Sequence, residues 1–146
     1  MGNIFWPGRL QKLENTQWNT TLKQGQELWI DGGHNESAGK ALSEQVRLWQ
    51  KQDDKPLTII LAMVDRKDPI EFIKPLLPYA DKIICTEIPD EPQSYAYKDL
   101  FHKVESLDKI KISYASSLEN ALTHTDKNSR VLATGSLFLI GNILQK

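Results

Sequence analysis

The chain has 146 residues, a length typical of one domain, and its formal net charge at pH 7 is −1. The near-neutral charge gives no sign of a nucleic-acid partner, and no segment approaches the roughly 20 apolar residues of a membrane span. We therefore expect the protein to bind neither nucleic acid nor a membrane. Cys85 is the only cysteine, which excludes an internal disulfide and a cysteine zinc cluster. Because the sequence starts without a secretory signal, we expect a cytoplasmic protein.

The first half of the sequence predicts alternating strands and helices. Residues 1–8 are expected to be an extended lead-in or a former interdomain linker, and residues 9–13 a possible edge strand. A short apolar strand at 28–30 precedes a helix at 36–51, whose apolar residues fall three and four positions apart. The continuous apolar run at 57–64 is typical of a strand that is covered on both faces.

The second half continues the alternation, and its remaining elements are expected to be a helix at 69–77 with Asp68 as N-cap, a strand at 82–86, a helix at 95–107, a strand at 110–114, a helix at 116–124, a strand at 130–134 and a helix at 137–144. This order predicts an α/β fold, a single Rossmann-like domain. Its mostly parallel sheet would have about five to six strands, with helices on both faces and a possible antiparallel edge strand.

The segment from Asp31 to Asn35 reads Asp-Gly-Gly-His-Asn and links a predicted strand to the next helix. In open α/β sheets, ligands bind at such strand ends. The Asp31 carboxylate could accept hydrogen bonds from vicinal hydroxyls, and His34 could donate to an anion or orient a nucleophile. Alternatively, the segment is a glycine turn in which Asp31 and Asn35 only cap the following helix.

Three further segments could contribute to the same edge of the sheet. Gly135-Ser136 opens the last predicted helix, where free N–H groups could bind a carboxylate or phosphate, although an isolated Thr-Gly-Ser is more typical of an ordinary N-cap at Ser136. Arg9 could grip a phosphate through paired hydrogen bonds. The charged run 65–68 is more typical of a solvated loop. The sequence contains no G-x-x-x-x-G-K-[ST] loop and no G-x-G-x-x-G motif. His34 has no second histidine at metal-ligand spacing, so no zinc site is expected.

Together, these segments resemble the C-terminal domain of folylpolyglutamate synthase/dihydrofolate synthase, a domain type shared with the Mur ligases of cell-wall synthesis. The similar segments are Trp6 to Gln11, Leu28 to Asn35, Asp65 to Pro69 and Thr134 to Leu139. The likeness extends over nearly the whole chain, so residues 1–146 are expected to form one such domain. Glu36 departs from the family, which often has proline at that position.

The resemblance implies a reaction and a role for four residues. The family uses ATP and Mg²⁺ to turn a carboxylate of dihydropteroate or folate into an acyl phosphate, which the amine of glutamate attacks. By resemblance, Arg9 contacts the ATP phosphates and Asp31 the ribose hydroxyls, His34 is the catalytic residue near the reacting phosphate or incoming glutamate, and Ser136 helps bind glutamate. The phosphate-binding loop and the metal ligands would belong to a larger N-terminal domain, so this chain alone is expected to be inactive.

Two alternatives remain open. The missing phosphate loop also suits a stand-alone α/β binding module, a remnant that keeps the fold and catalyses nothing. The shared domain type also allows a Mur-type ligase that acts on a peptidoglycan precursor, although the His34-Asn35 pair is more characteristic of the folate branch.

Overall fold

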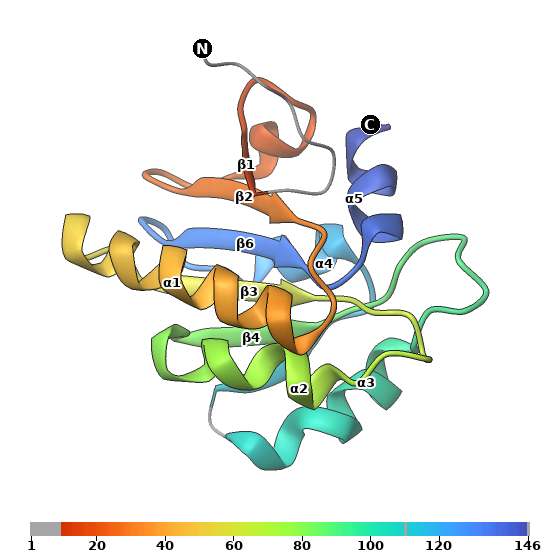
Figure 1. Cartoon of the computed structure of the whole chain (residues 1–146). Helices are drawn as coiled ribbons and strands as arrows, with labels where there is room; N and C mark the ends of the chain where they lie inside the picture. The colour runs from red at the N-terminus through yellow and green to blue at the C-terminus, as the bar shows by residue number, and fades with distance from the viewer. Residues whose placement is uncertain (1–9, 110, 146) are drawn as a thin grey trace.

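Six strands form one sheet in the order β1-β2-β6-β3-β4-β5 (Figure 1). The computed structural model describes residues 10–109 and 111–145. Its strands are β1 (Gln11–Leu13), β2 (Glu27–Asp31), β3 (Leu57–Leu61), β4 (Lys82–Cys85), β5 (Ile112–Tyr114) and β6 (Arg130–Thr134). β1 pairs antiparallel with β2, and the other neighbouring strands are parallel. The predicted α/β fold, with its mostly parallel sheet and antiparallel edge strand, is confirmed.

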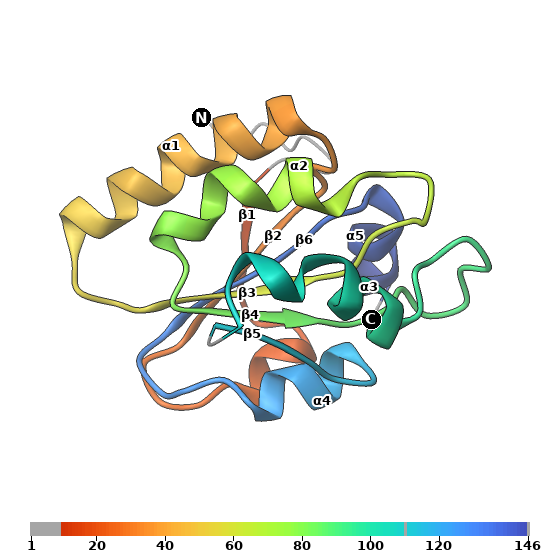
Figure 2. The ribbon, with the colours of Figure 1, turned by 90° about the horizontal axis from the view of Figure 1, so that it is seen from below.

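The helices of the described residues cover both faces of the sheet. They are α1 (Glu36–Gln52), α2 (Pro69–Ile73), α3 (Tyr97–Val104), α4 (Leu118–Thr123) and α5 (Leu137–Leu144). Figure 2 shows α1 and α2 on one side of the sheet and α4 on the other. The chain therefore buries two apolar surfaces, one on each side of the strands.

Side chains alternate across the strands and build a separate apolar core on each face. Ile59 belongs to the core beneath α1, α2 and α3, together with Phe72 and Leu100. Its neighbour Ile60 belongs to the opposite core, with Ile140 of α5. Because both faces are covered, every residue of β3 and β6 is buried, which explains the continuous apolar run in the sequence.

Two predicted boundaries are wrong for identifiable physical reasons. The strand expected at 57–64 ends at Leu61. The Ala62 N–H still donates to the Thr134 carbonyl of β6 at 3.2 Å, but Met63 and Val64 pair with a distant loop instead of a sheet strand: the Tyr95 N–H donates to the Met63 carbonyl at 2.9 Å. The helix expected at 69–77 becomes a 3-10 turn at Lys74–Tyr79, a stretch that contains two prolines without an N–H to donate.

Smaller differences concern chain ends and turns. The helix expected to start at residue 95 starts at Tyr97, and a 3-10 turn at Trp18–Thr21 was not predicted. The Trp18 indole of that turn donates to the Ile143 carbonyl at 3.1 Å and so ties the turn to α5. The expected lead-in at residues 1–8 lies outside the described residues.

The strand order creates a switch point at β6. This strand lies between β2 and β3, and in register Thr134 is paired with Asp31 on one side and Leu61 on the other. The chain leaves β2 into α1 on one face and leaves β6 into α5 on the opposite face. Open α/β sheets bind ligands in the crevice at such a point, outside the carboxyl ends of the strands.

Candidate functional site

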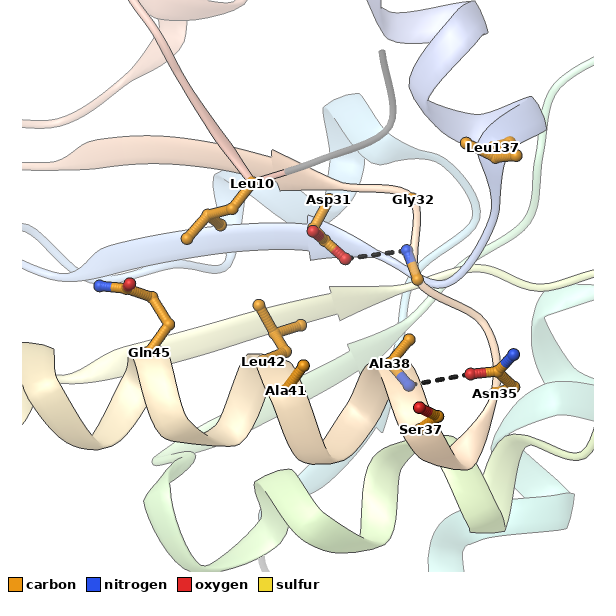
Figure 3. Close-up of a pocket in the computed structure, with 11 residues that line it drawn as sticks. Leu10, Asp31, Gly32, Asn35, Ser37, Ala38, Ala41, Leu42, Gln45 and Leu137 are labelled. Atoms are coloured by element: carbon orange, nitrogen blue, oxygen red, sulfur yellow. Dashed lines mark hydrogen bonds between the residues drawn. The ribbon is translucent and has the colours of Figure 1, made fainter. Parts of the chain in front are cut away.

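Asp31 ends β2, and its carboxylate shapes the turn that follows. Its Oδ2 accepts a hydrogen bond from the Gly33 N–H at 2.8 Å (Figure 3). Asn35 begins α1 by accepting from the Ala38 N–H, also at 2.8 Å. A Cβ at Gly33 would lie 2.8 Å from Asp31 Oδ2 and 2.9 Å from the Ala38 Cβ, so the turn requires glycine there. Asn35 is therefore the expected cap, whereas Asp31 holds the turn. A carboxylate has about four acceptor sites, so this bond leaves it able to contact a ligand.

A hollow of about 530 Å³ opens beside Asp31. Figure 3 shows Leu10 and Asp31 on its sheet side, with Leu42 and Gln45 of α1 opposite them. Leu137 of α5 also lines this hollow. Small-molecule sites have volumes of about 300–1,000 Å³ and mix apolar walls with a few polar groups, so this hollow suits an organic ligand that carries hydroxyl groups.

His34 and Ser136 line a second hollow, of about 480 Å³. The His34 Nδ1 lies 3.2 Å from the Gly32 carbonyl oxygen, which accepts a hydrogen bond when Nδ1 carries the proton. In that tautomer Nε2 is the unprotonated nitrogen, and it can accept a proton from a ligand.

Ser136 is the N-cap of α5, as one of the two sequence interpretations predicted. It is 3% exposed, and its Oγ accepts from the Phe138 N–H at 3.0 Å. Gly135 before it has a φ of +121°, and a Cβ there would lie 2.4 Å from the Ala62 carbonyl oxygen, so this position requires glycine. The cap uses a lone pair of the hydroxyl and leaves its proton to donate to a ligand.

Sequence analysis left two cations of this second hollow unassigned. Arg66 and Lys67 come from the loop after β3 and line the same hollow as His34. The exposed Arg66 donates to the Gln93 side chain. The half-buried Lys67 ammonium forms no ion pair or hydrogen bond within residues 10–109 and 111–145. Their position after a buried strand was visible in the sequence, but the pairing of β3 with β6 was not.

Three of the four predicted site residues therefore meet at one edge of the sheet. Asp31 and His34 follow β2, and Ser136 follows the adjacent β6. His34 and Ser136 share one hollow and Asp31 lines the neighbouring one, with Leu137 common to both. Arg9 lies outside the described residues.

The described part of the chain lacks two kinds of structure. It contains no helix with the length and apolar character needed to cross a bilayer. It also contains no group of three or more His, Cys, Asp or Glu side chains arranged to hold a metal ion.

Known proteins similar to this chain include dihydrofolate synthetases. Residues 12–146 match the family model described as dihydrofolate synthetase, C-terminal domain. The Schizosaccharomyces pombe protein named "Probable dihydrofolate synthetase" is 28% identical over 152 residues, which cover 97% of this chain and 34% of that protein. The dihydrofolate synthetase of Saccharomyces cerevisiae is 23% identical over 159 residues, covering 99% of this chain and 36% of that protein. The chain thus spans about a third of the length of these relatives.

Solved structures share the fold. Folylpolyglutamate synthase from Thermotoga maritima has a TM-score of 0.78 at 22% identity, over 98% of this chain and 31% of that one. The Mycobacterium tuberculosis enzyme complexed with ADP and AMPPCP has a TM-score of 0.75 at 20% identity, over 96% of this chain and 32% of that one. A bifunctional folylpolyglutamate synthase/dihydrofolate synthase with Mn, AMPPNP and L-glutamate bound has a TM-score of 0.70 at 19% identity, over 97% and 31%.

Proposed function

Because this chain belongs to the family of dihydrofolate synthetase C-terminal domains, we propose that residues 1–146 are the C-terminal part of an ATP-dependent ligase. In the proposed reaction, ATP phosphorylates a carboxylate of dihydropteroate or a folate. The glutamate amine then attacks the acyl phosphate, the new C–N bond forms, and phosphate leaves with the C–O bond electrons. The observation that carries the proposal is the meeting of Asp31, His34 and Ser136 at the carboxyl ends of adjacent strands.

The hollow beside Asp31 is the proposed site for the nucleoside part of ATP. The Asp31 carboxylate would accept hydrogen bonds from the ribose hydroxyls, as acidic residues do in dinucleotide-binding folds. Leu10 and Leu42 offer apolar surface for the base. Arg9 directly precedes Leu10 in the sequence, and we assign it to the phosphates because a guanidinium binds phosphate oxygens in pairs.

The hollow of His34 and Ser136 is the proposed site for glutamate. The Lys67 ammonium and the N–H groups that begin α5 would attract the carboxylate of glutamate. The Ser136 hydroxyl would donate a hydrogen bond to the same carboxylate. With Nδ1 protonated, His34 Nε2 would take a proton from the glutamate ammonium and free the amine for attack. A positioned base of this kind contributes about 10²–10⁴-fold to a rate.

The ligase needs parts that we assign to a separate N-terminal domain. The sequence lacks a phosphate-binding loop, and the described residues offer no metal cluster, so both the loop and the Mg²⁺ ligands are placed there. The relatives' threefold greater length supports this division. Leu137 and Phe138 also support it, since they are 55% and 51% exposed beside the two hollows, where a second domain would cover them.

Titration calorimetry of this chain with ATP, L-glutamate and a folate tests the proposal. It is carried out with and without the N-terminal two-thirds of the Schizosaccharomyces pombe relative as the ligase domain. We expect nucleotide and glutamate to bind more tightly when the domain is present, because ligands held between two bodies gain contacts from both. Tight binding of an unrelated ligand, with no response to the domain, would favour a stand-alone binding module. Preference for a peptidoglycan precursor in competition would favour a Mur-type ligase.

A further inference from the structure

We infer that the segment Gln93–Tyr95 is a strap that positions the loop Asp65–Asp68, and with it the Lys67 ammonium, at the hollow proposed for glutamate. The inference rests on the proposed function, which gives that hollow an anionic substrate. Figure 1 shows the two connections involved, one leaving the carboxyl end of β3 and the other the carboxyl end of β4. The strap belongs to the second of these connections, between β4 and α3.

Main-chain hydrogen bonds join the strap to the end of β3. The Tyr95 N–H donates to the Met63 carbonyl at 2.9 Å, and the Asp65 N–H donates to the Gln93 carbonyl at 2.7 Å. The residues between these bonds form an isolated antiparallel bridge. Residues 63–65 are thus paired with residues 93–95, which holds the chain at the start of the loop Asp65–Asp68.

Side chains of the strap reach the basic residues themselves. The Tyr95 hydroxyl donates to the Lys67 carbonyl oxygen at 3.3 Å. The Gln93 Oε1 accepts a hydrogen bond from the Arg66 guanidinium. The strap therefore contacts both basic residues that line the hollow: Lys67 through the main chain of Lys67, and Arg66 through the guanidinium of Arg66.

The strap is itself well held, and its tyrosine stays a donor. The Ser94 Oγ accepts from the Ile88 N–H at 3.0 Å and donates to the Tyr95 carbonyl at 2.8 Å. Burial, followed by the nearby charges of Asp65 and Asp68, raises the pKa of the Tyr95 hydroxyl above its ordinary value. The hydroxyl consequently keeps the proton that it donates to the loop at neutral pH.

Holding the main chain of Lys67 matters because its ammonium has no anchor among the described residues. The Lys67 N–H donates to the Val64 carbonyl at 3.2 Å, and its carbonyl is held by Tyr95. These bonds fix the main-chain position from which the side chain extends towards the hollow. A loop held in advance loses less conformational freedom when its cation binds an anion, so a held loop favours binding.

Tyr95→Phe tests the strap, because it removes one hydroxyl and keeps the ring. Tyr97→Phe is the matched control, since the Tyr97 hydroxyl forms no hydrogen bond with the described residues. Amide hydrogen exchange and titration with L-glutamate are both followed by NMR on this chain. Loss of one hydrogen bond predicts, for Tyr95→Phe, about 2–10-fold faster exchange at the Asp65 and Lys67 amides and a similar rise in the glutamate Kd. The control should change neither.

The outcomes separate the strap from the proposed function. Unchanged amide exchange in Tyr95→Phe overturns the strap, whatever the effect of the substitution on the glutamate Kd. Faster exchange with an unchanged glutamate Kd makes the contact purely structural and overturns its positioning role, while the proposed function stands. If the unsubstituted chain does not respond to glutamate with or without the ligase domain, the proposed function fails and the positioning role fails with it.

Discussion

Asp31 combines a turn contact with a proposed ligand contact, and two substitutions separate them. Asp31→Asn keeps an acceptor for the Gly33 N–H, whereas Asp31→Ala removes it. We expect Ala to lower the free energy of unfolding by about 0.5–1.5 kcal/mol and Asn to change it little. Both should weaken nucleotide binding to the reconstituted enzyme by about 10–100-fold, because hydrogen bonds to a charged group are lost. Urea unfolding and calorimetry measure the two effects.

Failure of Asp31→Ala to fold would make Asp31 a structural residue. Full nucleotide affinity in Asp31→Asn would show that the negative charge has no part in binding. Either result would remove Asp31 from the proposed nucleotide site.

Ser136 poses the same question at the start of α5. Replacing an N-cap serine by alanine costs about 1 kcal/mol, which lowers the Tm of a chain of this size by about 2–4 °C, whereas glycine costs only a few tenths of a kcal/mol. If the hydroxyl also donates to glutamate, Ser136→Ala and Ser136→Gly should lose glutamate affinity equally despite their different stabilities. Glutamate affinity that follows the Tm would assign Ser136 to capping alone.

The placement of Asp31, His34 and Ser136 at strand ends could be predicted from the sequence, because each belongs to a glycine-containing turn between a strand and a helix. That pattern is local and can be read without the fold. The placement of Lys67 beside His34 and Ser136 could not be predicted in the same way, because it depends on β6 lying between β2 and β3. Tertiary packing sets the strand order, and the spacing of residues in the sequence does not reveal it.

At the scale of elements, α1 and α2 approach each other closely at Gly39. A Cβ there would lie 2.3 Å from the Phe72 carbonyl oxygen, whereas a Cβ at Gly141 of α5 would meet nothing within 4 Å. We expect Gly39→Ala to destabilise the protein, because overpacking costs about 1–3 kcal/mol and outweighs the helix propensity of alanine. Gly141→Ala should instead stabilise it by about 0.8–1 kcal/mol. Thermal unfolding measures both, and stabilisation by both substitutions would contradict this packing.

The order and type of the elements followed from apolar periodicity, but several of their ends did not. The run 57–64 reads as one strand because its residues are buried throughout. Its last three residues are buried by the strap and by the cores on both faces, so burial alone did not mark the end of β3. Local hydrophobicity therefore predicts which residues are buried, whereas tertiary pairing decides which part of the molecule buries them.

At the scale of the whole molecule, the proposed site and a charged cluster occupy opposite ends of the central strands. Arg130 begins β6 and is 4% exposed. Its Nε contacts Glu27 Oε1 at 2.9 Å, its Nη2 contacts Asp53 Oδ2 at 2.7 Å, and its guanidinium lies 4.9 Å from the Trp49 ring centroid. Every group of this cluster is paired, so we assign it to stability rather than to catalysis.

This cluster predicts a loss of stability in acid. Burial raises the pKa of Glu27, but hydrogen bonds from Arg130 and Trp29 outweigh it and leave the pKa below its ordinary value. The hydrogen bond from Arg130 lowers the pKa of Asp53. Between the lowered and the ordinary pKa values the unfolded chain therefore binds more protons than the folded one. The stabilisation is present above that range and is lost as the pH falls through the lowered values.

Urea unfolding between about pH 7 and about pH 3 measures this dependence. Asp53→Asn should be less stable at neutral pH, with a shallower fall in acid, because one of the titrating partners is gone. Asp54→Asn is the control, since Asp54 is exposed and forms no ion pair with the described residues. Equal pH profiles for Asp53→Asn and the unsubstituted chain would exclude the cluster as the cause.

The central claim is that this chain supplies one side of a glutamate ligase site. It is tested most directly by ATP-dependent addition of glutamate to dihydropteroate, measured for the chain alone, for the ligase domain alone and for the two together. We predict product only with both present, and about 10²–10⁴-fold less when His34→Ala replaces the unsubstituted chain. Product from the chain alone, or full activity in His34→Ala, would contradict the account.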